Sequence, residues 1–104
     1  MSYKTKTIFA LSTPPGKSAI ALIRISGPDS YRCVKKLSSN MPKKPNTSSF
    51  NKLQTISGDI IDQAVTTYFK APKSYTGEDM VELAVHGGNA VVKKIIGLLN
   101  KETH

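Results

Sequence analysis

The chain has 104 residues, with 15 lysine and arginine residues against seven aspartate and glutamate residues and a formal net charge of +8. This length fits one domain, residues 1–104, near the lower end of the usual size range. No apolar run approaches a membrane span and no signal-peptide core follows the start, so we expect a cytoplasmic protein without membrane contact. The single cysteine, Cys33, excludes an internal disulfide and a cysteine-based metal cluster.

The positive charge makes an anionic partner conceivable, such as nucleic acid, a membrane surface or a polyanionic ligand. The lysines are scattered, however, and aromatic residues are not interleaved with them as they would be on a base-stacking platform. A solvated basic surface is the favoured explanation, and the charge alone does not establish RNA binding.

The first third of the chain predicts two strands and a helix. Residues 7–12 are short, apolar and β-prone, and the Thr-Pro-Pro-Gly sequence at 13–16 stops them. Residues 19–26 form an almost continuous apolar run, typical of a strand covered on both faces. Gly27-Pro28-Asp29 then ends this strand and starts a helix with apolar positions at helical spacing, namely Cys33, Val34 and Leu37.

Three more strands are predicted after this helix. Residues 38–49 are rich in Ser, Asn, Lys and Pro and predict an irregular connection. Residues 53–61 and 63–69 have strand character, with a hairpin connection at 61–63. Residues 80–86 form the fifth strand.

A final helix opens at 87–89 and has a broad apolar face, made by Val91, Val92, Ile95, Ile96, Leu98 and Leu99. The order is therefore β-β-α-β-β-β-α. We expect an α+β domain with a mixed sheet and two helices.

Arg24 interrupts the apolar run of the second strand. On a strand it shares one face with Leu22 and Ser26, while Ile23 and Ile25 face the other way. A guanidinium in an apolar setting needs a partner, because an unpaired buried ion is unfavourable. That partner is either a bound ligand or a glutamate in a structural ion pair.

Glu82 is likewise a charged residue within an apolar strand, the fifth. It shares a face with His86, whereas Val81 and Leu83 point to the opposite side. A carboxylate facing a cleft can accept two roughly parallel N–H bonds from a ligand. Arg24 would then meet an oxygen or carboxylate of the same ligand, or hold Glu82 in place.

Four residues near Glu82 are secondary candidates for ligand contacts. Tyr75 could stack on a flat ring, and Thr76, Glu78 and His86 could add polar contacts. Thr76 and Asp79 could equally hold the turn through bonds from side chain to backbone, which is the favoured role. Metal binding by His86 is not expected without a second nearby histidine or a cysteine, and we find no complete catalytic site.

Gly16-Lys17-Ser18 resembles the tail of a phosphate-binding Walker A loop. That loop requires a glycine five positions before Gly16, where this chain has Leu11, and Pro14 and Pro15 remove amide donors that the loop must present. We therefore expect no nucleotide site here.

Three parts of the sequence stand out together: Thr13-Pro14-Pro15-Gly16, the strand at 19–27, and Ser74-Tyr75-Thr76-Gly77-Glu78-Asp79 with His86-Gly87-Gly88. In their order and spacing they resemble the amino-terminal domain of the MnmE (TrmE) family of tRNA-modification GTPases. The resemblance covers about residues 7–99. It implies one half of the duplicated folate-binding fold of aminomethyltransferases, with 5-formyltetrahydrofolate or a related tetrahydrofolate contacted at the positions of Arg24 and Glu82.

The resemblance also implies a larger parent protein. The chain stops before the family's helical and GTPase domains, so we expect a domain truncated from a GTPase that binds GTP with magnesium and potassium ions outside this fragment. The parent would work with the FAD-containing protein MnmG on tRNA, building a carboxymethylaminomethyl group on the wobble uridine. The domain itself would bind rather than turn over, and form a homodimer by exchanging the strand at 7–12.

Two other functions stay open from the sequence. The chain could belong to a stand-alone folate-dependent aminomethyltransferase relative, or be a basic RNA-binding module. One departure from the family lies at Lys17-Ser18-Ala19, where many relatives have Arg-Gly-Gly. This puts an anion contact in that loop in doubt, but not the strand that follows.

Overall fold

The computed structural model describes residues 7–11, 20–74, 76–86 and 88–102. In this part of the chain the elements are β1 (Ile8–Leu11), β2 (Ala21–Ser26), α1 (Ser30–Lys35), β3 (Thr47–Gln54), β4 (Ile60–Phe69), β5 (Met80–Val85) and α2 (Asn89–Glu102). The predicted α+β class and element order are confirmed. Neither of these helices is long and apolar enough to cross a membrane. The proline turn at 13–16 and the Gly16-Lys17-Ser18 run lie outside the described residues.

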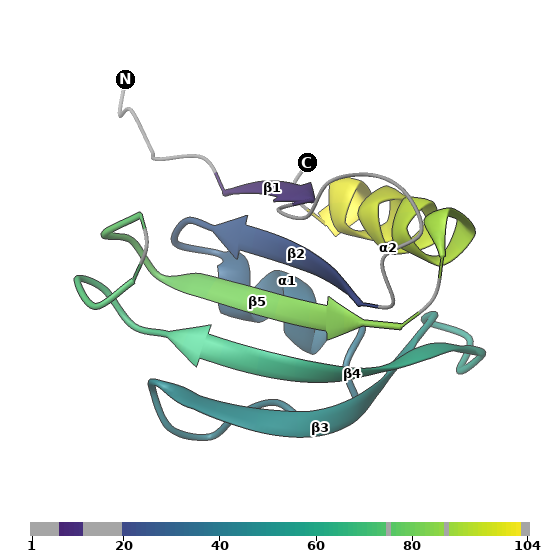
Figure 1. Cartoon of the computed structure of the whole chain (residues 1–104), viewed down its shortest axis with the longest axis horizontal. Helices are drawn as coiled ribbons and strands as arrows, with labels where there is room; N and C mark the ends of the chain where they lie inside the picture. The colour runs from purple at the N-terminus through teal and green to yellow at the C-terminus, as the bar shows by residue number, and fades with distance from the viewer. Residues whose placement is uncertain (1–6, 12–19, 75, 87, 103–104) are drawn as a thin grey trace.

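The five strands form one sheet in the order β1-β2-β5-β4-β3 (Figure 1). All four strand pairings are antiparallel, so the predicted mixed sheet was wrong. A parallel crossover must return the chain to the end of the sheet where the previous strand began. Here the chain leaves β2 at Ser26 and forms the six-residue α1. It then enters β3 at Thr47, at the end of the sheet where β2 finished, so no parallel crossover is made.

The predicted boundaries of the β3–β4 hairpin were wrong. β3 begins at Thr47, inside the segment expected to be irregular, and the turn lies at 55–59 rather than 61–63. In that turn Gly58 has a φ of 96°, which suits glycine, and its N–H donates to the carbonyl of Thr55 at 2.9 Å. β3 is an edge strand with exposed polar side chains, so its sequence lacks the apolar signal of an inner strand.

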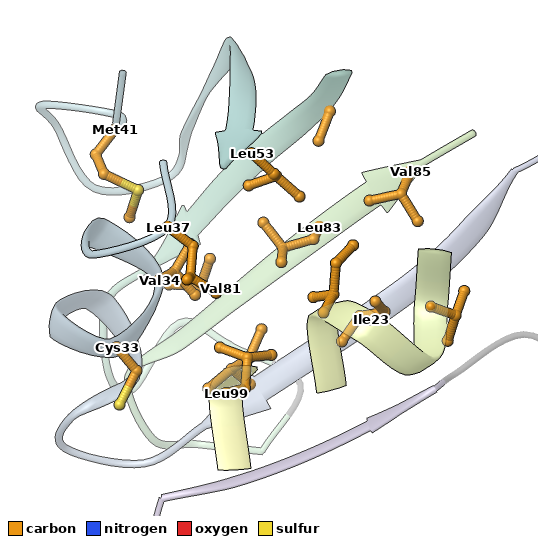
Figure 2. Close-up of a cluster of buried hydrophobic side chains, with 14 residues drawn as sticks. Ile23, Cys33, Val34, Leu37, Met41, Leu53, Val81, Leu83, Val85 and Leu99 are labelled. Carbon is orange, nitrogen blue, oxygen red and sulfur yellow. The ribbon is translucent and has the colours of Figure 1, made fainter. Parts of the chain in front are cut away.

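The two helices cover one face of the sheet. Ile23 and Leu83, from the adjacent strands β2 and β5, are fully buried in a cluster that also holds Leu99 of α2 and Val34 of α1 (Figure 2). Burial alternates along β2 and β5 as their sequences predict. The hydrophobic core therefore lies between the sheet and the helix layer.

The opposite face, which we call the open face, carries no helix of the described residues; α1 is seen behind β2 and β5 in Figure 1. Leu22 and Arg24 on this face are only partly buried, so the expectation that β2 is covered on both faces was wrong. Within the part of the chain that the structure describes, this face is covered at the end where Ser26 and Met80 are buried, next to Thr76.

A buried polar bridge ties the β3–β4 hairpin to the turn after α1. Asn51 is 3% exposed, and its Oδ1 accepts a hydrogen bond from Thr66 Oγ1 at 2.7 Å. Its Nδ2 donates to Ser38 Oγ. The Asn51 amide thus accepts one hydrogen bond and donates another, so the bridge fixes the edge hairpin against the helix layer while its amide oxygen and nitrogen are both paired.

We expect two isoleucines, one in the core and one exposed, to differ strongly in what they contribute to stability. Ile23→Ala should lower the free energy of unfolding by about 2–5 kcal/mol, because it opens a cavity in a closed cluster. The matched control Ile60→Ala, at a position 60% exposed, should cost less than about 1 kcal/mol. Urea unfolding followed by circular dichroism measures both. Equal losses for the two variants would contradict this assignment of the core.

Candidate functional site

The open face is built of rungs, each a row of directly opposed residues on neighbouring strands. The middle rung runs Ala10, Arg24, Glu82, Thr67 and Ser48 across all five strands. Opposed residues in an antiparallel sheet point to the same face. The sheet register therefore places Arg24 and Glu82 side by side, although they are far apart in the sequence.

Arg24 and Glu82 form an ion pair on the open face. Arg24 Nε donates to Glu82 Oε2 at 2.9 Å, and the two side chains are 35% and 19% exposed. The structural pair considered from the sequence is thus present in this chain. One carboxylate oxygen takes this contact, and a carboxylate can accept several hydrogen bonds, so Glu82 can still accept from a ligand.

Largely apolar rungs flank the ion pair on both sides. One runs Leu22, Ala84, Val65 and Phe50. The other runs Ile8, Ser26, Met80 and Phe69, and its Ser26 and Met80 are buried. Val65 and Phe50 are among the most exposed large apolar side chains of the described residues. A partly buried charge pair between two apolar strips suits a flat ligand with polar edges.

A hollow of about 400 Å³ lies at one end of the open face, lined by Phe69, Pro72, Lys73 and Ser74. Phe69 opposes Met80, whereas Thr67, two residues earlier, opposes Glu82. The hollow therefore begins one rung from the Arg24–Glu82 pair. Its volume falls within the usual range for small-molecule sites, about 300–1,000 Å³.

Thr76 and Glu78 hold the loop beside this hollow. Thr76 Oγ1 pairs with Ser26 Oγ at 2.6 Å, and the N–H of Glu78 donates to Thr76 Oγ1 at 3.4 Å. The carbonyl of Glu78 accepts a hydrogen bond from Ser74 Oγ. These contacts give Thr76 and Glu78 a structural role, while Tyr75 lies outside the described residues.

Asp79 anchors the same loop. Its Oδ1 accepts from the N–H of Ala71 at 2.9 Å and its Oδ2 from Lys70 Nζ at 3.1 Å. Its carbonyl accepts from the N–H of Gly27 at 2.8 Å. The hydrogen bond from Ala71, and then the Lys70 ammonium, hold the pKa of Asp79 below its usual value, and Asp79 in turn raises the pKa of Lys70. The predicted role of Asp79 in holding the loop is confirmed.

The structure does not bring His86 to the ion pair. Its backbone N–H donates to Asp62 Oδ2 at 2.8 Å, and its Nδ1 lies 3.2 Å from the carbonyl of Gln63. A carbonyl only accepts, so Nδ1 is the donor in this contact. The ring is therefore held at the far end of β5, and within the described ranges no three His, Cys, Asp or Glu side chains gather to hold a metal.

Sequence reasoning missed the contribution of β4 to this face. Val65, Thr67 and Phe69 reach the open face through the β4–β5 register, and Pro72 and Lys73 follow them into the hollow. The alternation of β4 is visible in the sequence. Its pairing partner is not, so nothing in the sequence linked these residues to Glu82.

The fold and the face together define a one-sided antiparallel α+β domain with a candidate ligand site on its open face. Comparison with known proteins gives the family. The family model described as "GTP-binding protein TrmE N-terminus" matches residues 7–104. The chain therefore belongs to the TrmE amino-terminal domain family, as its sequence motifs predict.

Three relatives illustrate the match. The chain is 48% identical over 91 residues to the mitochondrial tRNA modification GTPase mss1 of Schizosaccharomyces pombe, covering 86% of this chain and 18% of that protein. It is 47% identical over 95 residues to the tRNA modification GTPase MnmE of Ehrlichia chaffeensis, covering 91% and 22%. The corresponding figures for the MnmE of Thermotoga maritima are 46% over 95 residues, 91% and 21%. The chain spans about a fifth of the length of these relatives.

The contacts of Asp79 predict how the stability of the fold depends on pH. A carboxyl group whose folded pKa is depressed stabilises the fold above its unfolded pKa, about 3.9, and this contribution is lost as the pH falls through the lower folded value. Asp79→Asn should therefore reduce the free energy of unfolding by about 1–3 kcal/mol at neutral pH. Below about pH 4 the difference in free energy of unfolding between the variant and the native chain should become smaller. Urea titrations at several pH values measure this.

The matched control is Asp59→Asn in the exposed β3–β4 turn, which should change stability little. If the free energies of unfolding of the native chain and Asp79→Asn differ by a constant amount from pH 7 to pH 2.5, the charge of Asp79 does not anchor the loop.

Proposed function

We propose that this chain is the folate-binding domain of a tRNA-modification GTPase, and that Arg24 and Glu82 hold the pterin end of 5-formyltetrahydrofolate or a related tetrahydrofolate. The observation that carries the proposal is the Arg24–Glu82 pair, set between apolar rungs one rung from a hollow of about 400 Å³. Membership of the TrmE amino-terminal domain family agrees with the sequence resemblance that implied this ligand.

The chemistry of the open face fits such a ligand. A pterin presents an amino group and a ring N–H side by side, and the Glu82 carboxylate can accept both. Arg24 Nε engages Oε2 of Glu82 already, so the carboxylate is oriented before a ligand binds. Val65 and Phe69 offer apolar contacts to the flat ring, and Lys73 on the wall of the hollow could meet the ligand's carboxylates.

The rest of the proposed activity belongs to the longer parent. The relatives are named tRNA modification GTPases, and this chain matches only about a fifth of each. We propose that the parent hydrolyses GTP, with magnesium and potassium ions bound outside this chain. It would work with the FAD-containing MnmG to build a carboxymethylaminomethyl group on the wobble uridine of tRNA. The folate site would supply or guide the one-carbon unit.

Calorimetry with 5-formyltetrahydrofolate tests the site. Arg24→Ala and Glu82→Gln should each weaken binding by about 1–3 kcal/mol, the usual cost of leaving a hydrogen-bonded charge without its partner. The control is Arg32→Ala, which removes the same side chain from the helix layer and should leave the affinity unchanged. Thermal melting of each variant verifies that it is folded.

Two results would contradict this position of the folate site. Binding by the native chain that neither Arg24→Ala nor Glu82→Gln weakens would mean that the ligand lies elsewhere. An equal loss for Arg32→Ala would indicate a general effect of positive charge on an anionic ligand.

We also propose that the domain forms a homodimer through β1. Among the described strands β1 is an edge of the sheet, only four residues long, and its Ile8 is 64% exposed. In this chain β1 pairs with its own β2, with Ile8 opposite Ser26. Exchange of β1 between two copies would keep that register, and a second copy would cover the apolar edge.

Light scattering over a concentration series tests the dimer. The native chain should have twice its monomer mass at high micromolar concentration, and Ile8→Lys should shift the equilibrium toward monomer. Ile60→Lys, at a position with nearly the same exposure away from β1, should not. A monomeric mass at every concentration, with and without folate, would overturn both the pairing and the strand exchange.

A further inference from the structure

A second hollow, of about 290 Å³, lies on the helix side of the sheet, with Tyr31 of α1 and Tyr68 of β4 among its lining residues. Tyr68 packs against the core cluster beneath the helices, whereas its neighbour Phe69 lines the hollow on the open face. Consecutive strand residues point to opposite faces. The two hollows therefore lie on opposite sides of the sheet, and the second hollow is separate from the proposed folate site.

The aromatic wall of this hollow is held in a fixed geometry. The rings of Tyr31 and Tyr68 lie edge to face, with centroids 4.8 Å apart and an angle of 61° between their planes. The hydroxyl of Tyr31 donates to the carbonyl of Pro42 at 2.9 Å, and Pro28 and Pro42 complete the apolar lining. Such a wall offers ring surface to a flat partner at little entropic cost.

Positive charge surrounds the same hollow. Arg32 and Lys43 are among its lining residues, and further exposed lysines continue along α1 and the following segment, namely Lys35, Lys36 and Lys44. Arg32 contacts Asp29 at 3.5 Å, but both side chains are more than half exposed, so this pair is weak and can exchange for another anion.

One carboxylate, Asp79, also lines the hollow. Its oxygens are engaged by the N–H of Ala71 and by Lys70 Nζ. The charge that remains to attract a partner from solution is therefore positive. An aromatic wall beside a basic rim is the combination that binds single-stranded nucleic acid.

We propose that this hollow binds one nucleotide of a single-stranded RNA segment, with the base against Tyr31 and Tyr68 and the adjoining phosphates at Arg32 and Lys43. A base inside a duplex could not reach the ring surfaces, which favours a loop or an end over a helix. The choice of RNA over other polyanions rests on the proposed function, because the relatives are named tRNA modification GTPases. The site itself rests only on the hollow, the rings and the charges.

Fluorescence anisotropy with a labelled single-stranded RNA oligonucleotide tests this, across a series of salt concentrations. The variant Arg32→Ala with Lys43→Ala should weaken binding and flatten the salt dependence, because phosphate contacts release counterions. Lys93→Ala with Lys94→Ala removes the same two charges from exposed positions of α2 and should have a clearly smaller effect. Tyr31→Leu should weaken binding at least about fivefold, the lower end of what a stacked base contributes.

Tyr31→Phe keeps the ring and should keep most of the affinity, which separates stacking from the loss of the Pro42 hydrogen bond. Equal losses for the two double variants would mean non-specific attraction to the +8 charge and would overturn the site. So would equal affinity for an RNA duplex, or for heparin. Folate affinity, measured on the same variants, should stay at the native value, so failure of one proposal is distinguishable from failure of the other.

Discussion

The pairing of β2 with β5 is the constraint on which the rest of the molecule depends. It sets Ile23 opposite Leu83 on the helix side and Arg24 opposite Glu82 on the open side. If β2 shifted by one residue in this register, Arg24 would enter the core and Ile23 would be exposed to solvent. The hydrophobic core and the candidate site are therefore fixed by the same set of backbone contacts, and the fold cannot form without bringing the ion pair together.

The loop at 70–79 connects the two sides of this sheet. It lines the hollow of the open face through Pro72, Lys73 and Ser74, while Asp79 at its end also lines the hollow on the helix side. Contacts from Thr76 to Ser26 and from Ala71 to Asp79 tie the loop to the end of β2 and to itself. A ligand in either hollow would therefore contact a segment that the other hollow shares.

Much of this organisation could be predicted from the sequence, because apolar alternation reports which face of a strand is buried. That alternation set Arg24 and Glu82 on the faces opposite Ile23 and Leu83, although the same apolar run wrongly predicted cover on both faces of β2. β3 was misplaced because an edge strand with polar side chains carries little apolar signal, and the mixed sheet was wrong because strand direction depends on the path of the connections. The sequence also separates Tyr31 and Tyr68, so the aromatic and basic hollow emerges only when folding brings these two rings together.

The central claim is that a folate binds the open face, at the ion pair that the register of β2 and β5 creates. The most direct test is an NMR titration of the ¹⁵N-labelled chain with 5-formyltetrahydrofolate. Saturable amide shift changes should gather at Arg24, Glu82, Thr67 and Phe69 and their neighbours on the open face, and leave α1 nearly unperturbed. Changes confined to α1 and the segment after it, with the middle rung unaffected, would contradict the account.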